Sequence, residues 1–337
     1  MGKLKNFTQN LILIAIIISS SIIIGVIFEK QRELNFSSLN ILQIPFEVKN
    51  ITFTENKNGN KEQIEQNSEV QQDTGEKNET ELSETNWQWL ENQKKLYKLN
   101  STEINFILTE IQKRFPDKFK RLKALSILRL GTPYQLGCLG EEAGRDKDPI
   151  FRLDITDCTA FVLTNVALLH SQSLAEAREM MRYLNYQPNS EMTFENRLHF
   201  TTDRNEVSPY FQDITGEVLC GCSLKAVEVT LNKIKADGER LIDINWEKET
   251  VFRYIPNEYI TKELFQNLPK ALGIAFIKKG DEEIGLDVRH EGFLFDGELL
   301  FHASSAKGEV VSEDFFGYYF GENSSSRFDG VILFEIK

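Results

Sequence analysis

The cysteine at position 158 stands where a protein can activate a nucleophile. It follows Thr156 and Asp157, and either residue can cap a helix that begins at this point. A helix N-terminus offers free amide groups and the positive end of the helix dipole, which favour a thiolate over a thiol. We therefore expect Cys158 to ionise readily and to act as a nucleophile. A buried structural cysteine in an apolar helix is the alternative.

Two of the four histidines in the chain could serve this cysteine as partners. His290 opens one predicted strand, His302 lies on the next, and Asp296-Gly297 between them is a hairpin signal. Neighbouring antiparallel strands bring such side chains close together on one face of a sheet. A catalytic imidazole also needs a second polar group that fixes its tautomer and orientation. The pattern therefore predicts a site made of Cys158, His290 and His302.

The elements that must position these residues follow from the hydrophobic pattern of 87–337. Helices are expected over Ser101–Ile111, Phe119–Leu130, Asp157–His170, Ser173–Leu184 and Leu224–Lys235. Strands are expected over Ala271–Ile277, Glu291–Phe295, Glu298–Ala303, Glu309–Val311 and Gly330–Ile336. Helices that precede strands in this way indicate an α+β domain, with helices packed on an antiparallel sheet.

The N-terminal segment indicates an anchored, exported protein. Residues 11–28 carry no charge, and as a helix they would span about 27 Å, close to the hydrocarbon thickness of a bilayer. Lys3 and Lys5 precede this stretch, which favours a cytoplasmic N-terminus over 1–10 and export of the rest. A cleaved signal peptide is the alternative. The linker 29–86 is polar from residue 55 onward and is expected to be largely disordered there.

Composition narrows the partners that the chain could have. The formal net charge is −12 over 337 residues and no basic stripe is visible, which argues against nucleic acid. Four cysteines do not make a disulfide scaffold in a chain of this length. Cys220-Gly-Cys222 resembles half a zinc site but lacks a second pair, so structural roles are expected for these residues and for Cys138. We expect neither a metal nor another cofactor, and the sequence indicates no oligomeric state.

Four blocks of the sequence resemble those of the N-acetylmuramoyl-L-alanine amidase-like family, a branch of the NlpC-type papain-like cell-wall cysteine hydrolases. They are Leu130–Leu139, Asp154–Val162, Asn196–Asp203 and Gly285–Val311. The last block is the most specific, because a His-Glu-Gly-Phe strand is followed by His-Ala-Ser-Ser and by Gly-Glu-Val-Val. The resemblance begins near Ser101 and implies an α+β, papain-like (NlpC-type) domain over 87–337. It does not cover the single transmembrane helix and the disordered tether that the residues before this domain predict.

The resemblance also implies roles for individual residues. Cys158 would be the nucleophile, His290 the general base and His302 the residue that orients the base. Tyr134 matches a tyrosine beside the nucleophile, and its hydroxyl could stabilise the oxyanion together with the backbone N–H of Cys158. The alternative for Tyr134 is a packed aromatic residue after a turn.

Other matched positions imply substrate contacts. Arg197 and His199 would line the substrate groove, although a purely structural role is the alternative for both. The chain departs from the family around the base, where a charged Glu291 replaces the usual hydrophobic residue after His290 and Arg289 precedes it. If Glu291 faces the groove it tunes which stem peptide is accepted, and if it points away it does not.

The activity implied by the resemblance is hydrolysis of the amide between N-acetylmuramic acid and L-alanine in peptidoglycan fragments (muropeptides). Such a protein would sit in the bacterial inner membrane, with its catalytic domain outside the cytoplasm. An endopeptidase that cuts the stem peptide after γ-D-glutamate would use the same residues. A zinc hydrolase with Cys158, His290 and His302 as ligands, or a non-catalytic cell-wall-binding module, are alternatives of another class.

Overall fold

The computed structural model describes residues 84–337 apart from 141–143, 147–150 and 322–324. The predicted membrane anchor over 11–28 and the linker as far as residue 83 lie outside the described residues. Within the described part of the chain, no helix combines the length and the apolar character that a membrane crossing requires.

The helices expected in the first half of the domain are present, and each begins at a capping side chain. The α-helices are α3 (Ser101–Arg114), α4 (Lys118–Arg129), α5 (Cys158–Leu169), α6 (Leu174–Asn185), α7 (Thr201–Val207), α8 (Thr215–Val218), α9 (Lys262–Gln266) and α10 (Phe315–Phe320). Asn100, rather than Ser101, caps α3, and Asp117, Asp157 and Ser173 cap the next three helices. Each cap satisfies amide groups that have no acceptor within the helix.

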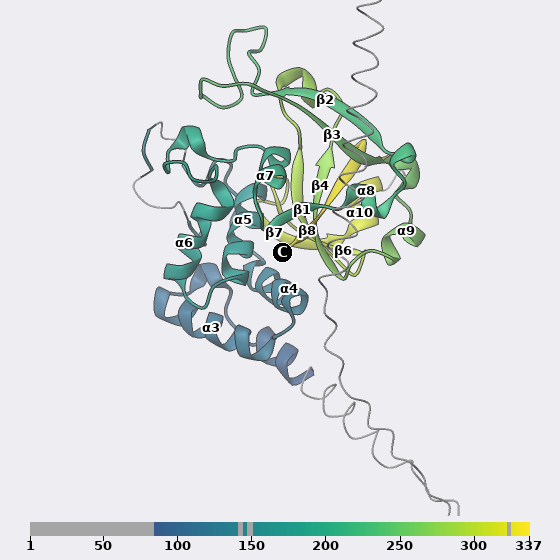
Figure 1. Ribbon diagram of the computed structural model, residues 1–337. Helices are drawn as coiled ribbons and strands as arrows, with labels where there is room; N and C mark the ends of the chain where they lie inside the picture. Colours follow the sequence, from purple (N-terminus) through teal and green to yellow (C-terminus); the bar gives the residue numbers. More distant parts are fainter. Residues whose placement is uncertain (1–83, 141–143, 147–150, 322–324) are drawn as a thin grey trace, which may run out of the picture. The chain divides into compact units, whose positions relative to one another are not determined.

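Eight strands form one antiparallel sheet in the order β2-β3-β8-β4-β5-β6-β7, with β1 paired to β8. The strands are β1 (Phe211–Asp213), β2 (Lys225–Leu231), β3 (Lys248–Pro256), β4 (Ala271–Ile277), β5 (His290–Phe295), β6 (Leu299–Ser304), β7 (Glu309–Asp314) and β8 (Gly330–Ile336). The five expected strands are therefore confirmed as β4 to β8. Figure 1 shows the sheet beside a separate group of helices.

The helix expected over Leu224–Lys235 is wrong, because this segment contains β2. Val227, Val229 and Leu231 alternate with more exposed residues, and the burial pattern follows that period of two. The strand pairs along its whole length with β3, from Lys225 opposite Tyr254 to Leu231 opposite Lys248. Valine and threonine also fit a pleated strand better than a helix.

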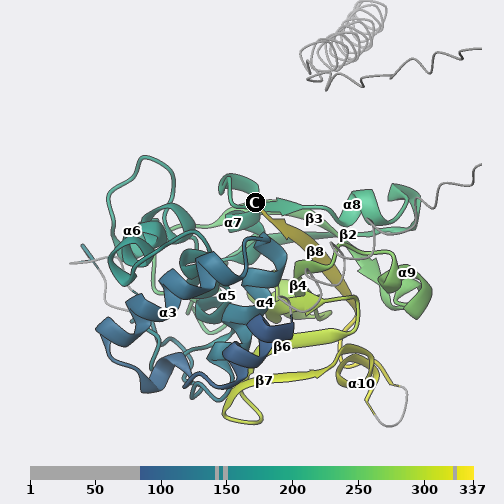
Figure 2. The ribbon, with the colours of Figure 1, turned by 90° about the horizontal axis from the view of Figure 1, so that it is seen from below.

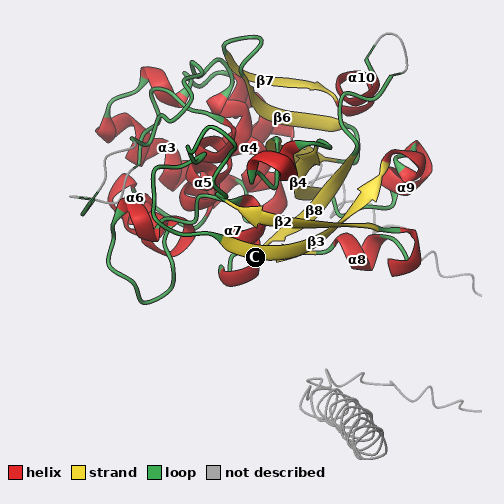
Figure 3. Ribbon diagram, turned by 90° about the horizontal axis from the view of Figure 1, so that it is seen from above, coloured by secondary structure: helices red, strands yellow, loops and turns green. Residues whose placement is uncertain are grey.

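The two faces of the sheet pack against different helices. One hydrophobic core joins α3 to α6 with Phe293, Phe295 and Phe301 of the sheet, and the other joins α9 and α10 with Leu294 and Leu300. Figure 3 shows α3 to α6 gathered on one side of the strands, with α8, α9 and α10 on the other. In Figure 2, α10 lies beside the ends of β6 and β7. The α+β class with helices on an antiparallel sheet is thus observed.

Helix α5 is the centre of the helical layer. Every residue from Ala160 to Leu169 is buried, so this helix is apolar on all sides rather than along one stripe. The ring of Phe161 contacts that of Phe293 on β5, with their centroids 5.6 Å apart. This contact holds the first turn of α5 against the sheet.

Candidate active site

Cys158 is the first residue of α5. The Asp157 carboxylate accepts from the N–H of Ala160 at 2.8 Å and from the N–H of Gly137 at 3.1 Å, so it caps the helix and ties a loop to it. The backbone N–H of Glu291, at the start of β5, lies close to the sulfur of Cys158 and partly offsets the rise in the pKa of this thiol that burial causes. The sulfur therefore lies against the peptide bond that follows His290.

The two histidines meet as expected. His290 Nε2 lies 2.8 Å from His302 Nδ1, and the second nitrogen of His302, Nε2, lies 3.3 Å from Oε1 of Glu313 on β7. Because a carboxylate can only accept, His302 carries its proton on Nε2, and its Nδ1 accepts the proton of His290 Nε2. This order of donors leaves the Nδ1 of His290 unprotonated. Among the described residues this nitrogen makes no hydrogen bond, and neither imidazole hydrogen-bonds the sulfur of Cys158 directly.

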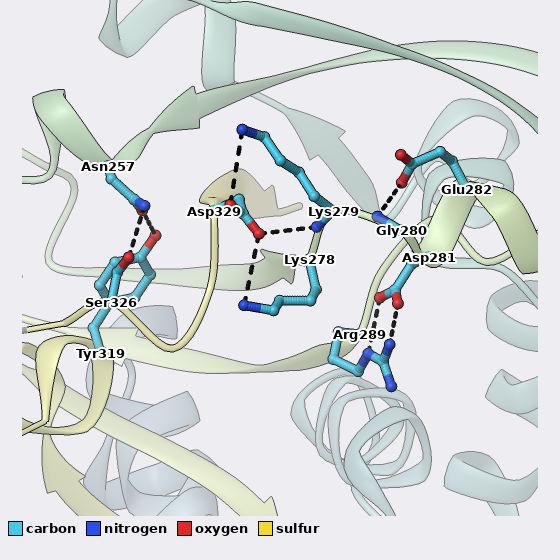
Figure 4. A network of polar contacts seen from close by, with 10 residues as sticks. All are labelled: Asn257, Lys278, Lys279, Gly280, Asp281, Glu282, Arg289, Tyr319, Ser326 and Asp329. Carbon is cyan, nitrogen blue, oxygen red and sulfur yellow. Dashed lines mark hydrogen bonds and ion pairs between the residues drawn. The ribbon is translucent and has the colours of Figure 1, made fainter.

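Ion pairs hold both sequence neighbours of His290. The Nε of Arg289 donates to the buried Asp281 at 2.8 Å, a contact drawn in Figure 4. Glu291 forms a two-point pair with Arg204 at 3.0 and 2.7 Å, and both side chains are 1% exposed. The carboxylate of Glu291 is thus held inside the protein by Arg204, where its charge still acts on Cys158 and His290. Together the two pairs fix the backbone on both sides of His290.

A short parallel backbone bridge connects Tyr134 to Thr156, two residues before Cys158. The N–H of Gln135 donates to Thr156 O, and the N–H of Thr156 donates to Pro133 O, both at 2.9 Å. The bridge places Tyr134 close enough to Cys158 for the sulfur to influence its hydroxyl. Burial, followed by the charges of Cys158 and Asp157, raises the pKa of Tyr134 to about 12, so its hydroxyl keeps its proton at neutral pH.

The pKa of the Cys158 thiol differs from our expectation that this thiol ionises readily. Burial raises the pKa of Cys158 to about 12, and the negative charges of Glu291 and Asp157 act in the same direction. Burial also lowers the pKa of His290 to about 3 and, together with the positive charges of Lys307 and Arg327, that of His302 to about 4. Loss of solvation thus outweighs the helix dipole. The resting site holds a neutral thiol and two neutral imidazoles.

Arg197 and His199 lie in a neighbouring part of the structure, and the side chains of both form hydrogen bonds with other residues of the protein. Arg197 is 5% exposed, pairs with the buried Asp146 at 2.8 and 3.0 Å, and donates to Gly140 O at 2.7 Å. His199 Nε2 lies 2.7 Å from Phe194 O. Arg197 also borders a pocket of about 320 Å³ that Trp246 lines. A substrate-binding role for Arg197 and His199 stays a prediction.

Two residues beside the histidine pair, Glu313 and Tyr318, were not predicted from the sequence. Glu313 lay beyond the strand expected to end at Val311, whereas β7 extends to Asp314 and brings Glu313 to the face that holds His302. Tyr318 on α10 has its ring centroid 4.6 Å from that of His302 and 6.2 Å from that of His290. The signal for Glu313 was the continued alternation of the strand. For Tyr318 it was only the aromatic run Phe315–Phe320.

Of the other cysteines, Cys138 lies within electrostatic reach of Asp157 and Tyr134. Cys138 is a buried free thiol whose pKa burial raises to about 12, and Cys220 is exposed. The side chain of Cys222 lies outside the described residues. Within the described ranges, no three His, Cys, Asp or Glu side chains are arranged to hold a metal ion.

Comparisons with known proteins give the family that this chain matches and the solved structures that it resembles. A family model for the N-acetylmuramoyl-L-alanine amidase-like proteins matches residues 124–324. A Legionella pneumophila str. Philadelphia 1 protein of family DUF1460 is 22% identical, with a TM-score of 0.55 over 70% of this chain and 97% of that chain. An N-acetylmuramoyl-L-alanine amidase from Bacteroides uniformis ATCC 8492 is 20% identical, with a TM-score of 0.49 over 65% and 99% of the two chains. No curated protein matches the chain.

The similarity to the Legionella structure corrects the expected fold type. We expected an NlpC-type papain-like domain, but the matching fold is that of the DUF1460/AmiA-like proteins. The transmembrane helix that we expected before this domain lies outside the described residues. The α+β class and the antiparallel sheet hold. The matched sequence blocks surround the site and leave out 207–259, which supplies β1 to β3, so they carried no information about that edge of the sheet.

Proposed function

The chain belongs to the N-acetylmuramoyl-L-alanine amidase-like family, and on that premise we propose that it cleaves the amide bond between N-acetylmuramic acid and L-alanine in peptidoglycan, with Cys158 as nucleophile. One observation carries the proposal: the series His290–His302–Glu313 ends in an unprotonated nitrogen of His290, and the backbone N–H of the next residue, Glu291, lies close to the sulfur of Cys158, the first residue of α5. Peptidoglycan lies outside the cytoplasmic membrane, and we propose that the domain works there.

In the first half of the reaction, the sulfur of Cys158 attacks the carbonyl carbon of the lactyl group. The thiol proton passes to His290 Nδ1 as the carbon–sulfur bond forms, because the neutral thiol needs a base. The imidazolium then donates this proton to the nitrogen of L-alanine as the amide bond breaks. A thioester and a free stem peptide result.

In the second half, His290 takes a proton from water, and the resulting hydroxide attacks the thioester. The sulfur leaves as a thiolate and recovers the proton from His290, which restores the resting site. His302 keeps its hydrogen bond to His290 Nε2 throughout, so the Nδ1 of the base stays directed at the reacting atoms.

Two donors are available for the negative oxygen of the tetrahedral intermediates. The N–H of Cys158 has no acceptor within α5, because this residue occupies the first helical position. The Tyr134 hydroxyl is protonated at neutral pH and lies beside Cys158. Donors that are already in place before the charge develops lower the barrier without reorganisation.

Mass spectrometry of digested peptidoglycan tests the proposal. The expected products are N-acetylmuramic acid with a free lactyl carboxylate and a stem peptide with a free L-alanine amine. A new D-glutamate γ-carboxyl end would instead identify an endopeptidase and overturn the proposed bond. Binding to the cell wall without any turnover would identify a binding module.

Variants and inhibitors test the mechanism separately from the bond. Cys158→Ala is expected to lower kcat on the order of 10⁴-fold, and iodoacetamide should abolish activity. A chelator should leave the rate unchanged. Inhibition by the chelator together with resistance to iodoacetamide would favour a zinc hydrolase and contradict the cysteine mechanism.

A further inference from the structure

An exposed arginine stands beside the imidazole pair and plays no part in the mechanism above. The guanidinium carbon of Arg327 lies 5.1 Å from the ring centroid of Tyr318, whose ring in turn packs on His302 at 4.6 Å. The charge of Arg327 reaches the site, because it adds to the lowering of the pKa of His302 that burial causes and opposes the rise that burial causes in the pKa of Tyr318. Tyr318 also lies within electrostatic reach of Cys158. Arg327 is therefore a solvent-facing cation at the border of the reacting groups.

The fold holds this arginine in place from both sides. Figure 4 shows Asn257 between Tyr319 and Ser326, which are the direct sequence neighbours of Tyr318 and Arg327. Asn257 accepts from the Tyr319 hydroxyl and donates to Ser326 Oγ at 2.8 Å. The N–H of Arg327 also donates to Tyr319 O at 2.9 Å. The ring of Tyr318 adds a cation–π contact, which orients the guanidinium without using its N–H donors.

Arg327 has no carboxylate partner among the described residues. Glu313, the carboxylate that contacts His302, already pairs with Lys307 at 3.1 Å. Asp329 pairs with Lys278 and accepts from the N–H of Lys279 at 2.9 Å, as Figure 4 shows. A positioned guanidinium whose donors are directed to solvent offers two parallel hydrogen bonds to an incoming carboxylate.

We propose that Arg327 is a specificity residue that binds a carboxylate of the substrate's stem peptide. The inference rests on the proposed function, because that reaction supplies a peptide whose first carboxylate beyond L-alanine is the α-carboxylate of γ-linked D-glutamate. The substrate class is therefore a muropeptide with a free isoglutamate carboxylate. Amidation of this group to isoglutamine removes the charge and leaves the shape nearly unchanged.

The test compares two synthetic muropeptides that differ only in this group, one with isoglutamate and one with isoglutamine. The wild-type protein is expected to cleave the isoglutamate form with a kcat/KM roughly 10- to 100-fold higher, as for a charge-assisted pair. Arg327→Gln should lower kcat/KM by that factor on the isoglutamate form and leave the isoglutamine form unchanged. Arg327→Lys, which keeps the charge without the two-point geometry, should retain part of the preference.

Lys270→Gln is the matched control. This lysine is 82% exposed and lies at the end of β4 opposite to the position that pairs with His290, so its loss removes a surface charge far from the site. It should leave the preference intact. An equal loss on both substrates in Arg327→Gln would mean that the arginine only supports Tyr318, and a wild-type protein without any preference would overturn carboxylate recognition. Both outcomes leave the proposed function standing, whereas failure to cleave either muropeptide would overturn that function and this inference with it.

Discussion

Gly292 and His302 lie directly across from each other on neighbouring strands, with no room for a side chain between them. A Cβ placed on Gly292 would lie 3.0 Å from the Cβ of His302 and 2.5 Å from the carbonyl oxygen of Phe301. Gly292 is two residues from His290 and therefore shares its face of β5. The missing side chain leaves the space in which the two imidazoles meet.

We expect Gly292→Ala to lower kcat/KM at least about 100-fold, because the new methyl group would push His302 away from His290. The fold should lose about 1–3 kcal/mol in the free energy of unfolding, as for other overpacked positions. Urea unfolding and muropeptide kinetics measure the two effects. Gly216→Ala is the control, since a Cβ at that glycine meets no atom within 4 Å. Near-wild-type turnover in Gly292→Ala would show that the histidine contact does not matter.

The carboxylate of Glu313 sets the tautomer of both histidines, so its removal should slow the chemical step. We expect Glu313→Ala to lower kcat about tenfold with little change in KM, because Glu313 lies 3.3 Å from His302 and water can partly replace it. Glu298→Ala, at an exposed position in the hairpin that joins β5 to β6, is the matched control. Equal rates for the two variants would contradict the role of Glu313.

The raised pKa of Cys158 predicts an unusual pH dependence of alkylation. Only the thiolate reacts, and its fraction rises about tenfold per pH unit as long as the pH lies below the pKa of about 12. Modification of the peptide that contains Cys158 by iodoacetamide should therefore keep accelerating from pH 7 to pH 9 and beyond. Free cysteine, with an ordinary pKa near 8.5, levels off in this range and serves as the reference. A rate that is already constant below pH 6 would instead indicate a resting thiolate–imidazolium pair.

The buried ion pair of Arg204 and Glu291 should affect stability mainly when one partner is removed, because the other charge is then buried without a counter-charge. Glu291→Leu leaves the Arg204 guanidinium buried without a counter-charge and should cost about 3–5 kcal/mol in the free energy of unfolding. The double variant Arg204→Met/Glu291→Leu should recover most of this loss, as urea unfolding would measure. If the losses of unfolding free energy in Glu291→Leu and Arg204→Met simply add up in the double variant, the two residues are not coupled.

The same double variant should also change the reactivity of Cys158. The charge of Glu291 raises the pKa of Cys158, so its removal should lower that pKa and speed up alkylation at a given pH. Alkylation rates at pH 8 for the wild type and the double variant measure this effect. A slower reaction in the double variant would contradict the assigned direction.

Local signals in the sequence were enough to predict that Cys158 begins a helix and that His290 and His302 lie in contact. Asp157 caps α5, and the cap places Cys158 at the first turn whatever the rest of the chain does. Alternating apolar residues and the Asp296-Gly297 turn define β5 and β6, and with them the meeting of His290 and His302. These features depend on residues close together in the chain, so a single sequence predicts them.

Tertiary structure decided the features that depend on residues far apart in the sequence or on the burial of a side chain. The segment around Val229 is a strand because β3 pairs with it, although a helix was expected there. Glu313 and Tyr318 contact His302 because β7 and α10 lie beside β6. Glu291 is buried because it pairs with the buried guanidinium of Arg204. The neutral thiol of Cys158 has the same origin: burial depends on everything that surrounds a side chain, and its cost exceeds what a helix start can offset.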